Sequence, residues 1–128
     1  MSERIDVEIA PSILSADFSA LGEEIKKVET VAKSIHIDVM DGHYVPNITI
    51  GVPVIRSLRK VTDIMFDVHL MIDNPIGYID AFADAGSDVI TLHIETLAKP
   101  MEAIEQVRIK GKSVGLSIHP DTAVDVLW

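Results

Sequence analysis

The sequence has no cysteine, few basic residues and no long apolar run. Without cysteine, these 128 residues cannot form disulfides, thiolate metal sites or a cysteine nucleophile. Only 11 lysines and arginines stand against 20 aspartates and glutamates, and the net charge of -9 argues against binding to nucleic acid or anionic membranes. The charged N-terminus shows no signal peptide or membrane span. We therefore expect a cytoplasmic protein without nucleic-acid or membrane partners.

Apolar residues, in contrast, are abundant. They make up 48% of the chain, which is enough for one hydrophobic core within a single domain over residues 1–128. The acidic balance does not exclude an anionic substrate, because a bound divalent metal can create a positive site inside an acidic protein.

Short β-rich runs alternate with segments of helical periodicity. The β-rich runs cover residues 7–14, 34–40, 64–72, 88–94 and 113–118. The helical segments cover residues 19–32, 51–60, 75–85 and 99–110. Pro75 and Pro100 suit the first turns of their helices, and Gly86 suits a helix end. This alternation predicts an α/β fold with a parallel sheet.

The number of elements leaves two architectures open. The chain has five predicted strands, four helices that alternate with them, and the start of a fifth helix at residues 121–128. They form either an open five-stranded sheet or a partial (β/α)8 barrel of the TIM type, truncated just past its middle. A complete barrel of this type needs about 250 residues.

The second and third predicted strands each place polar side chains on one face. Because side chains alternate along a strand, His36, Asp38 and Met40 share a face, and the opposite face is apolar. On the third strand, His69 and Met71 share a face in the same way, together with Asp67. These faces lie near the C-terminal ends of the strands, where barrels carry their active sites.

The fourth predicted strand adds His93 on the equivalent face. Imidazole and carboxylate groups from neighbouring strands suit Zn²⁺, Fe²⁺, Mn²⁺ or Co²⁺. A single histidine on a strand is more often structural, and Met40 and Met71 could serve as core residues. From the pattern alone, a metal or catalytic site and a purely structural role both stay open.

Three linked motifs resemble the ribulose-phosphate 3-epimerase family. Residues 10–18, APSILSADF, resemble its opening motif, and residues 36–49, HIDVMDGHYVPNIT, resemble its second-strand signature. Residues 67–71, DVHLM, resemble its third-strand signature. The resemblance runs from about Ile9 to the end of the chain and implies the N-terminal part, strands one to five, of a (β/α)8 barrel.

The resemblance also implies an activity and a set of site residues. The activity is metal-dependent interconversion of D-ribulose 5-phosphate and D-xylulose 5-phosphate in the pentose phosphate pathway. His36, Asp38 and His69 would bind the metal, and Asp38 would also act as acid and base. Ser12 and His69 would contact the phosphorylated ketose, and Met40 and Met71 would line the site. The resemblance does not identify the metal, and we also expect a homo-oligomer.

Part of the family's pattern is absent from these residues. The second catalytic aspartate and the glycine-rich phosphate loops of such enzymes follow later strands, and no Asp-Gly-Gly or Gly-Phe-Gly-Gly motif occurs here. We therefore expect this chain alone to be inactive. Two other functions stay open: epimerisation of another ketose phosphate, such as D-allulose 6-phosphate, and a non-catalytic half-barrel that self-associates. Asp38-Val39-Met40 lacks the lysine of the Asp-x-Lys motif in related decarboxylases and aldol-type synthases.

Overall fold

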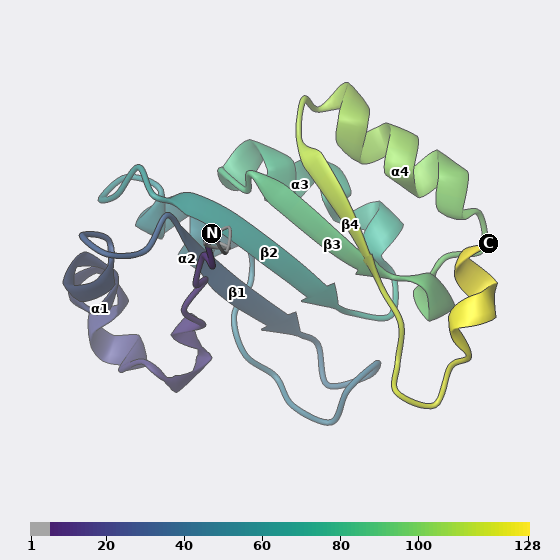
Figure 1. Ribbon diagram of the computed structural model, residues 1–128, viewed down its shortest axis with the longest axis horizontal. Coiled ribbons are helices and arrows are strands. Elements are labelled where there is room, and N and C mark those ends of the chain that lie inside the picture. Colours follow the sequence, from purple (N-terminus) through teal and green to yellow (C-terminus); the bar gives the residue numbers. More distant parts are fainter. Residues whose placement is uncertain (1–5) are drawn as a thin grey trace, which may run out of the picture.

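Four parallel strands form the single sheet of the described part of the chain. The computed structural model describes residues 6–128. The strands are β1 (Ser34–Met40), β2 (Met65–Met71), β3 (Val89–His93) and β4 (Ser113–Ser117), in the spatial order β1-β2-β3-β4. Each strand pairs in parallel with its sequence neighbour (Figure 1). The predicted α/β fold with a parallel sheet is thus confirmed.

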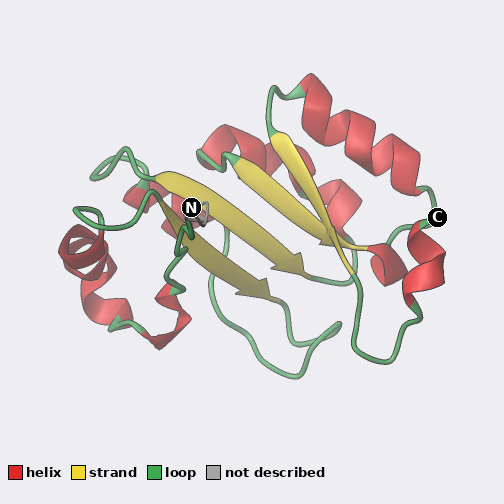
Figure 2. Cartoon of the chain, in the orientation of Figure 1, coloured by secondary structure: helices red, strands yellow, loops and turns green. Residues whose placement is uncertain are grey.

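Four helices connect and flank these strands. They are α1 (Leu21–Val28), α2 (Val52–Leu58), α3 (Ile79–Ala85) and α4 (Pro100–Ile109), and Figure 2 shows their alternation with the strands. Pro100 occupies the first turn of α4, where its missing N–H costs no hydrogen bond. Gly86 ends α3 with a φ of 119°, a left-handed conformation that glycine adopts without strain. No helix of residues 6–128 is long and apolar enough to cross a membrane.

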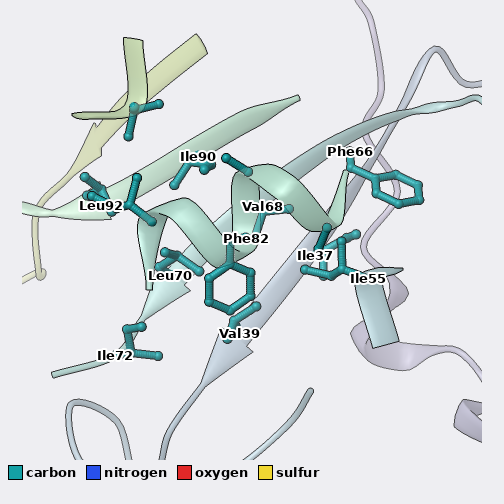
Figure 3. Close-up of a cluster of buried hydrophobic side chains, with 14 of the residues drawn as sticks. Ile37, Val39, Ile55, Phe66, Val68, Leu70, Ile72, Phe82, Ile90 and Leu92 are labelled. Carbon is teal, nitrogen blue, oxygen red and sulfur yellow. The ribbon is translucent and has the colours of Figure 1, made fainter. Parts of the chain in front are cut away.

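The hydrophobic core lies between one face of the sheet and the helices. Ile37, Val68 and Ile90 are completely buried on this face of β1, β2 and β3. In Figure 3, Phe82 of α3 lies among the buried side chains of the strands. Burial of each such side chain stabilises the fold by about 1.5–3 kcal/mol. The apolar stripe therefore fixes which face of each strand is turned away from the helices.

The first predicted strand, residues 7–14, is wrong. Only Ser12 of this stretch forms a β-bridge, a parallel one to His36 in β1, which is reinforced by the His36 N–H donating to the Pro11 carbonyl at 2.8 Å. Pro11 has no N–H to continue the ladder. The Ser12 hydroxyl accepts a hydrogen bond from the Leu14 N–H and starts a 3₁₀ turn, Ile13–Ser15. The segment therefore passes alongside the sheet as a single contact.

The predicted fifth helix, residues 121–128, is also wrong. The structure has a short 3₁₀ turn at Val124–Leu127 in its place, and none of its residues is buried. Its apolar residues have no partner face among residues 6–128, since β4 itself is only partly covered. Without tertiary packing, so short a segment cannot sustain a stable helix.

Candidate metal centre

The face of the sheet opposite the helices carries a polar cluster on β1 and β2. The strand register places Asp38 of β1 beside His69 of β2, and His36 beside Asp67. Their side chains are partly exposed, whereas the residues between them on each strand are buried. The period-two alternation that buries the apolar stripe therefore presents these polar groups together on the other face.

His36, Asp38 and His69 offer three ligand atoms that lie within 4.8 Å of one another. Asp38 Oδ1 is 3.2 Å from His36 Nε2 and 3.6 Å from His69 Nδ1. One carboxylate oxygen and two imidazole nitrogens converging on a common space make a donor set that suits zinc and other first-row transition metals. The structure thus brings together all three residues that the sequence predicted as ligands, in an arrangement that could hold a divalent ion.

Ser12 lies beside this cluster because of its single β-bridge to β1. Its hydroxyl donates a hydrogen bond of 2.7 Å to Asp38 Oδ2, whereas the distances to the two histidines given above are from Oδ1. Each oxygen of Asp38 therefore has a different neighbour. The serine holds the carboxylate in one orientation, and the other oxygen stays directed at the imidazole nitrogens.

His36 has partners at both ring nitrogens. Its Nδ1 lies 2.9 Å from Asp67 Oδ2, and its Nε2 points towards Asp38. A carboxylate behind a histidine fixes the ring orientation and directs the free nitrogen forward, as is common at metal sites. The sequence had placed Asp67 on the correct face but without a role.

His69 contacts a second imidazole on the next strand. Its Nε2 lies 2.7 Å from Nε2 of His93, a residue that is only 7% exposed. Burial lowers the pKa of His69 below its usual value, and the neighbouring His93 and His36 lower it further. Burial also lowers the pKa of His93, although Glu95 opposes this effect. Both rings are thus favoured in their neutral forms, which can bind metals and hydrogen-bond to each other.

Tyr44 and Glu95 complete the polar network behind His93. The Tyr44 hydroxyl lies 2.9 Å from His93 Nδ1 and donates to Glu95 Oε2 at 3.1 Å. Burial raises the pKa of Tyr44 to about 12, with a further contribution from the adjacent Glu95. Burial alone would raise the pKa of Glu95, but hydrogen bonds from the His119 backbone N–H, the Thr122 side chain and Tyr44 lower it to about 2. The phenol is therefore neutral and the carboxylate ionised.

The loop after β1 is tied back to the end of that strand. The Thr49 hydroxyl donates to the Asp38 carbonyl at 2.7 Å and accepts from the Met40 N–H at 3.0 Å. Asp41, which directly follows β1, accepts hydrogen bonds from the backbone N–H groups of Tyr44 and Asp73. The backbone that carries Asp38 is thus held by two loops.

Met40 and Met71 lie beside each other at the ends of β1 and β2, paired in register. Both are partly buried and follow Asp38 and His69 by two positions, on the same face of the sheet. They give the polar cluster an apolar border. The sequence singled out neither Thr49 nor Tyr44, because loop residues show no periodicity that would reveal which way they point.

Comparisons with known proteins agree with the motifs. A family model described as the ribulose-phosphate 3 epimerase family matches residues 8–128. The chain is 51% identical over 122 residues to the ribulose-phosphate 3-epimerase of Bacillus subtilis strain 168, covering 94% of this chain and 56% of the relative. It is 50% identical over 125 residues to that of Synechocystis sp. PCC 6803, covering 95% of this chain and 54% of the relative. The chain spans about half the length of the curated relatives it matches.

Proposed function

Because the chain belongs to the ribulose-phosphate 3-epimerase family, we propose that it forms part of an enzyme that epimerises D-ribulose 5-phosphate at C3 to D-xylulose 5-phosphate. The four-stranded sheet is a portion of the family's TIM barrel, and we assign residues 1–128 to a single domain, the N-terminal part of that barrel. The convergence of His36, Asp38 and His69 is the observation that best supports the function.

In this proposal His36, Asp38 and His69 hold one divalent ion: Zn²⁺, Fe²⁺, Mn²⁺ or Co²⁺. The mixed nitrogen and oxygen donors favour these metals over Mg²⁺ or Ca²⁺, which prefer oxygen alone. When bound, such an ion supplies Lewis-acid stabilisation of the negative charge that develops on the carbonyl oxygen of the sugar.

Asp38 is the proposed acid and base. Epimerisation next to a carbonyl removes one weakly acidic proton from carbon and returns a proton to the opposite face. The Asp38 carboxylate takes or returns the proton on its side, and the Ser12 hydroxyl keeps that carboxylate oriented through the bond to Oδ2. Ser12 and His69 also contact the substrate, and Met40 and Met71 keep water from the reacting carbon.

A second carboxylate is needed on the opposite face of the substrate. The candidate ligand set of residues 6–128 contains only one, Asp38, so we propose that these 128 residues do not turn over substrate on their own. A chimera that joins this chain to the uncovered part of the Bacillus subtilis relative would supply a second carboxylate from the part of the relative that this chain does not match. We expect the chimera to be active in an assay coupled to xylulose 5-phosphate and the 128-residue chain to be inactive; robust turnover by the chain alone would contradict the proposal.

Metal dependence is tested with the same chimera. We expect activity to fall to background after chelation and to return on addition of Zn²⁺, Fe²⁺, Mn²⁺ or Co²⁺, and the ion that restores the highest kcat identifies the preferred metal. Unchanged activity after complete metal removal, verified by elemental analysis, would contradict the proposed role of the cluster.

The loop at residues 46–51, PNITIG, favours ribulose 5-phosphate over D-allulose 6-phosphate, the alternative ketose. Competition between the two substrates for the chimera, expressed as the ratio of kcat/KM values, decides this point. We further propose a cytoplasmic homo-oligomer. In the described residues, β4 is paired only with β3, and its other edge is open to a second chain, which supports self-association. Self-association would also be the function of a non-catalytic half-barrel.

A further inference from the structure

A chain of four polar groups runs from the candidate metal centre to a surface carboxylate. His69 Nε2 lies 2.7 Å from His93 Nε2, and His93 Nδ1 lies 2.9 Å from the Tyr44 oxygen. The Tyr44 hydroxyl donates to Glu95 Oε2 at 3.1 Å. The groups come from β2, β3, the loop after β1 and the turn that follows β3, so separate parts of the fold build the chain together.

The direction of each hydrogen bond follows from its end point. An ionised carboxylate can only accept, so the Tyr44 O–H donates to Glu95. The Tyr44 oxygen then accepts from His93, which places the His93 proton on Nδ1. In a neutral ring the His93 Nε2 is therefore without a proton, and it must accept from the Nε2–H of His69.

The result is one defined tautomer of His69. With its proton on Nε2, the lone pair of His69 lies on Nδ1, the nitrogen that is 3.6 Å from Asp38 Oδ1. The opposite tautomer of His69 would leave no proton between two nitrogens that are 2.7 Å apart, because His93 Nε2 carries none. The chain thus prepares the nitrogen that faces the cluster for metal binding.

We propose that His93 is a positioning residue for the metal centre, because its hydrogen bond fixes the tautomer of His69. Tyr44 and Glu95 in turn hold the proton of His93 on Nδ1. This inference rests on the proposed metal site. His93 would orient His69 as Asp67 orients His36, whose Nδ1 lies 2.9 Å from the Asp67 carboxylate. Outer partners of this kind typically change metal affinity by about 10- to 100-fold. Glu95 also accepts from the His119 backbone N–H, so the segment after β4 anchors the far end.

The first test reads the tautomers directly, without metal. Nitrogen-15 spectra of the imidazole rings, recorded at about pH 8 where histidine side chains are ordinarily neutral, report which nitrogen carries the proton. We expect the Nε2–H form for His69 and the Nδ1–H form for His93, the opposite of each other. An Nε2–H form for His93 would overturn the inference.

The second test compares Tyr44→Phe with Tyr78→Phe in the same chain. Both changes remove one phenolic hydroxyl, but Tyr78 is 51% exposed at the start of α3 and has no part in the hydrogen bonds that link His69, His93, Tyr44 and Glu95. We expect Tyr44→Phe to weaken Co²⁺ binding by about 10-fold or more, to change the visible absorption of the bound Co²⁺ and to mix the His93 tautomers. Tyr78→Phe should behave like the wild type.

The outcomes separate this inference from the function on which it rests. Equal Co²⁺ affinity and spectra for Tyr44→Phe and the wild type would overturn the role of the chain while leaving the metal site intact. Absence of Co²⁺ binding by the wild type would overturn both. If Tyr44→Phe does not fold, as judged by circular dichroism, the tautomer spectra of the wild type still decide.

Discussion

The Ser12 hydroxyl orients the Asp38 carboxylate relative to His36 and His69. Ser12 donates to Asp38 Oδ2, and this bond leaves Oδ1 free to face His36 and His69. A hydrogen bond to a charged group is worth about 1.5–3 kcal/mol. The serine therefore contributes to the geometry of the site even where it does not touch a reacting atom.

Replacement of this serine tests its contribution. We expect Ser12→Ala in the chimera to lower kcat/KM by roughly 10- to 100-fold, which corresponds to the loss of one charge-assisted hydrogen bond. Ser57→Ala is the matched control, because Ser57 is exposed on α2. Equal kcat/KM for the two variants would show that the Ser12 hydroxyl does not orient the carboxylate.

Glu95 gives a pH-dependent prediction. Its pKa in the folded protein is about 2, below the usual 4.5, because hydrogen bonds outweigh the effect of burial. A depressed pKa stabilises the fold above pH 4.5, and this stabilisation is lost as the pH falls from 4.5 to about 2. In urea unfolding, we expect the wild type to lose more stability than Glu95→Gln across this window. Glu105→Gln, an exposed change on α4, should follow the wild type; parallel curves for all three proteins would contradict the assignment.

At the scale of the elements, the end of β1 depends on a loop residue. The Thr49 hydroxyl bonds to the Asp38 carbonyl and to the Met40 N–H, and so closes the loop onto the strand. We expect Thr49→Val, which keeps the shape and removes both bonds, to lower the free energy of unfolding by about 1–3 kcal/mol. It should also weaken metal binding, because Asp38 loses its backbone support.

The control for this change is Thr30→Val, since Thr30 is exposed in the turn after α1. Urea unfolding measures the stability of both variants, and Co²⁺ titration measures their metal affinity. An unfolding free energy for Thr49→Val that matches that of the control would show that the loop does not support β1.

The buried stripe of the strands carries the stability of the sheet. Leu70 of β2 is completely buried, and we expect Leu70→Ala to lower the free energy of unfolding by about 2–5 kcal/mol because it leaves a cavity. The same substitution at Leu127, which is 38% exposed in the terminal 3₁₀ turn, should change it by less than about 0.5 kcal/mol. Similar losses at the two positions, measured by urea unfolding, would contradict the assignment of the core.

The sequence predicted the regular elements well where periodicity was strong. The ranges of β1 to β4 follow from alternating patterns, and each of the four helices lies inside a predicted helical segment. Pro75 is an exception to the predicted helix starts, because it opens a separate 3₁₀ turn, Pro75–Gly77, and α3 begins only at Ile79. The predictions for residues 7–14 and 121–128 were wrong for different reasons. Pro11 interrupts the hydrogen-bond ladder of the first segment, and no residue of the terminal 3₁₀ turn, Val124–Leu127, is buried. The alternation of side chains along each strand also placed His36, Asp38 and His69 on one face of neighbouring strands, as the structure has them.

The parts of the site that the sequence did not reveal depend on tertiary contacts. Tyr44 and Thr49 lie in a loop, and their contacts with His93 and with β1 span up to 49 residues. Glu95 lies two positions beyond His93 in the sequence, but its bond to Tyr44 follows only from the path of that loop. Side-chain direction in a loop is set by its fold and not by its period.

At the scale of the whole molecule, the two faces of the sheet have different roles: the apolar face packs in the core, and the polar face carries the candidate site. The helices cover the apolar face, and the opposite face holds the candidate metal-binding cluster near the C-terminal strand ends, where TIM-barrel enzymes carry their active sites. Both features agree with the TIM barrel of the ribulose-phosphate 3-epimerase family, in which helices surround the sheet and the active site lies at the C-terminal ends of the strands. We propose that this cluster binds a catalytic divalent ion.

Equilibrium dialysis of the chain against Co²⁺ or Zn²⁺, followed by elemental analysis, measures whether the cluster binds such an ion. We predict about one ion per wild-type chain and at least about 10-fold weaker binding for Asp38→Asn, since the loss of the carboxylate removes one of three ligands. Asp121→Asn, an exposed change outside the cluster, should bind like the wild type. No binding by the wild type, or equal binding by wild type and Asp38→Asn, would show that the cluster is not a metal site.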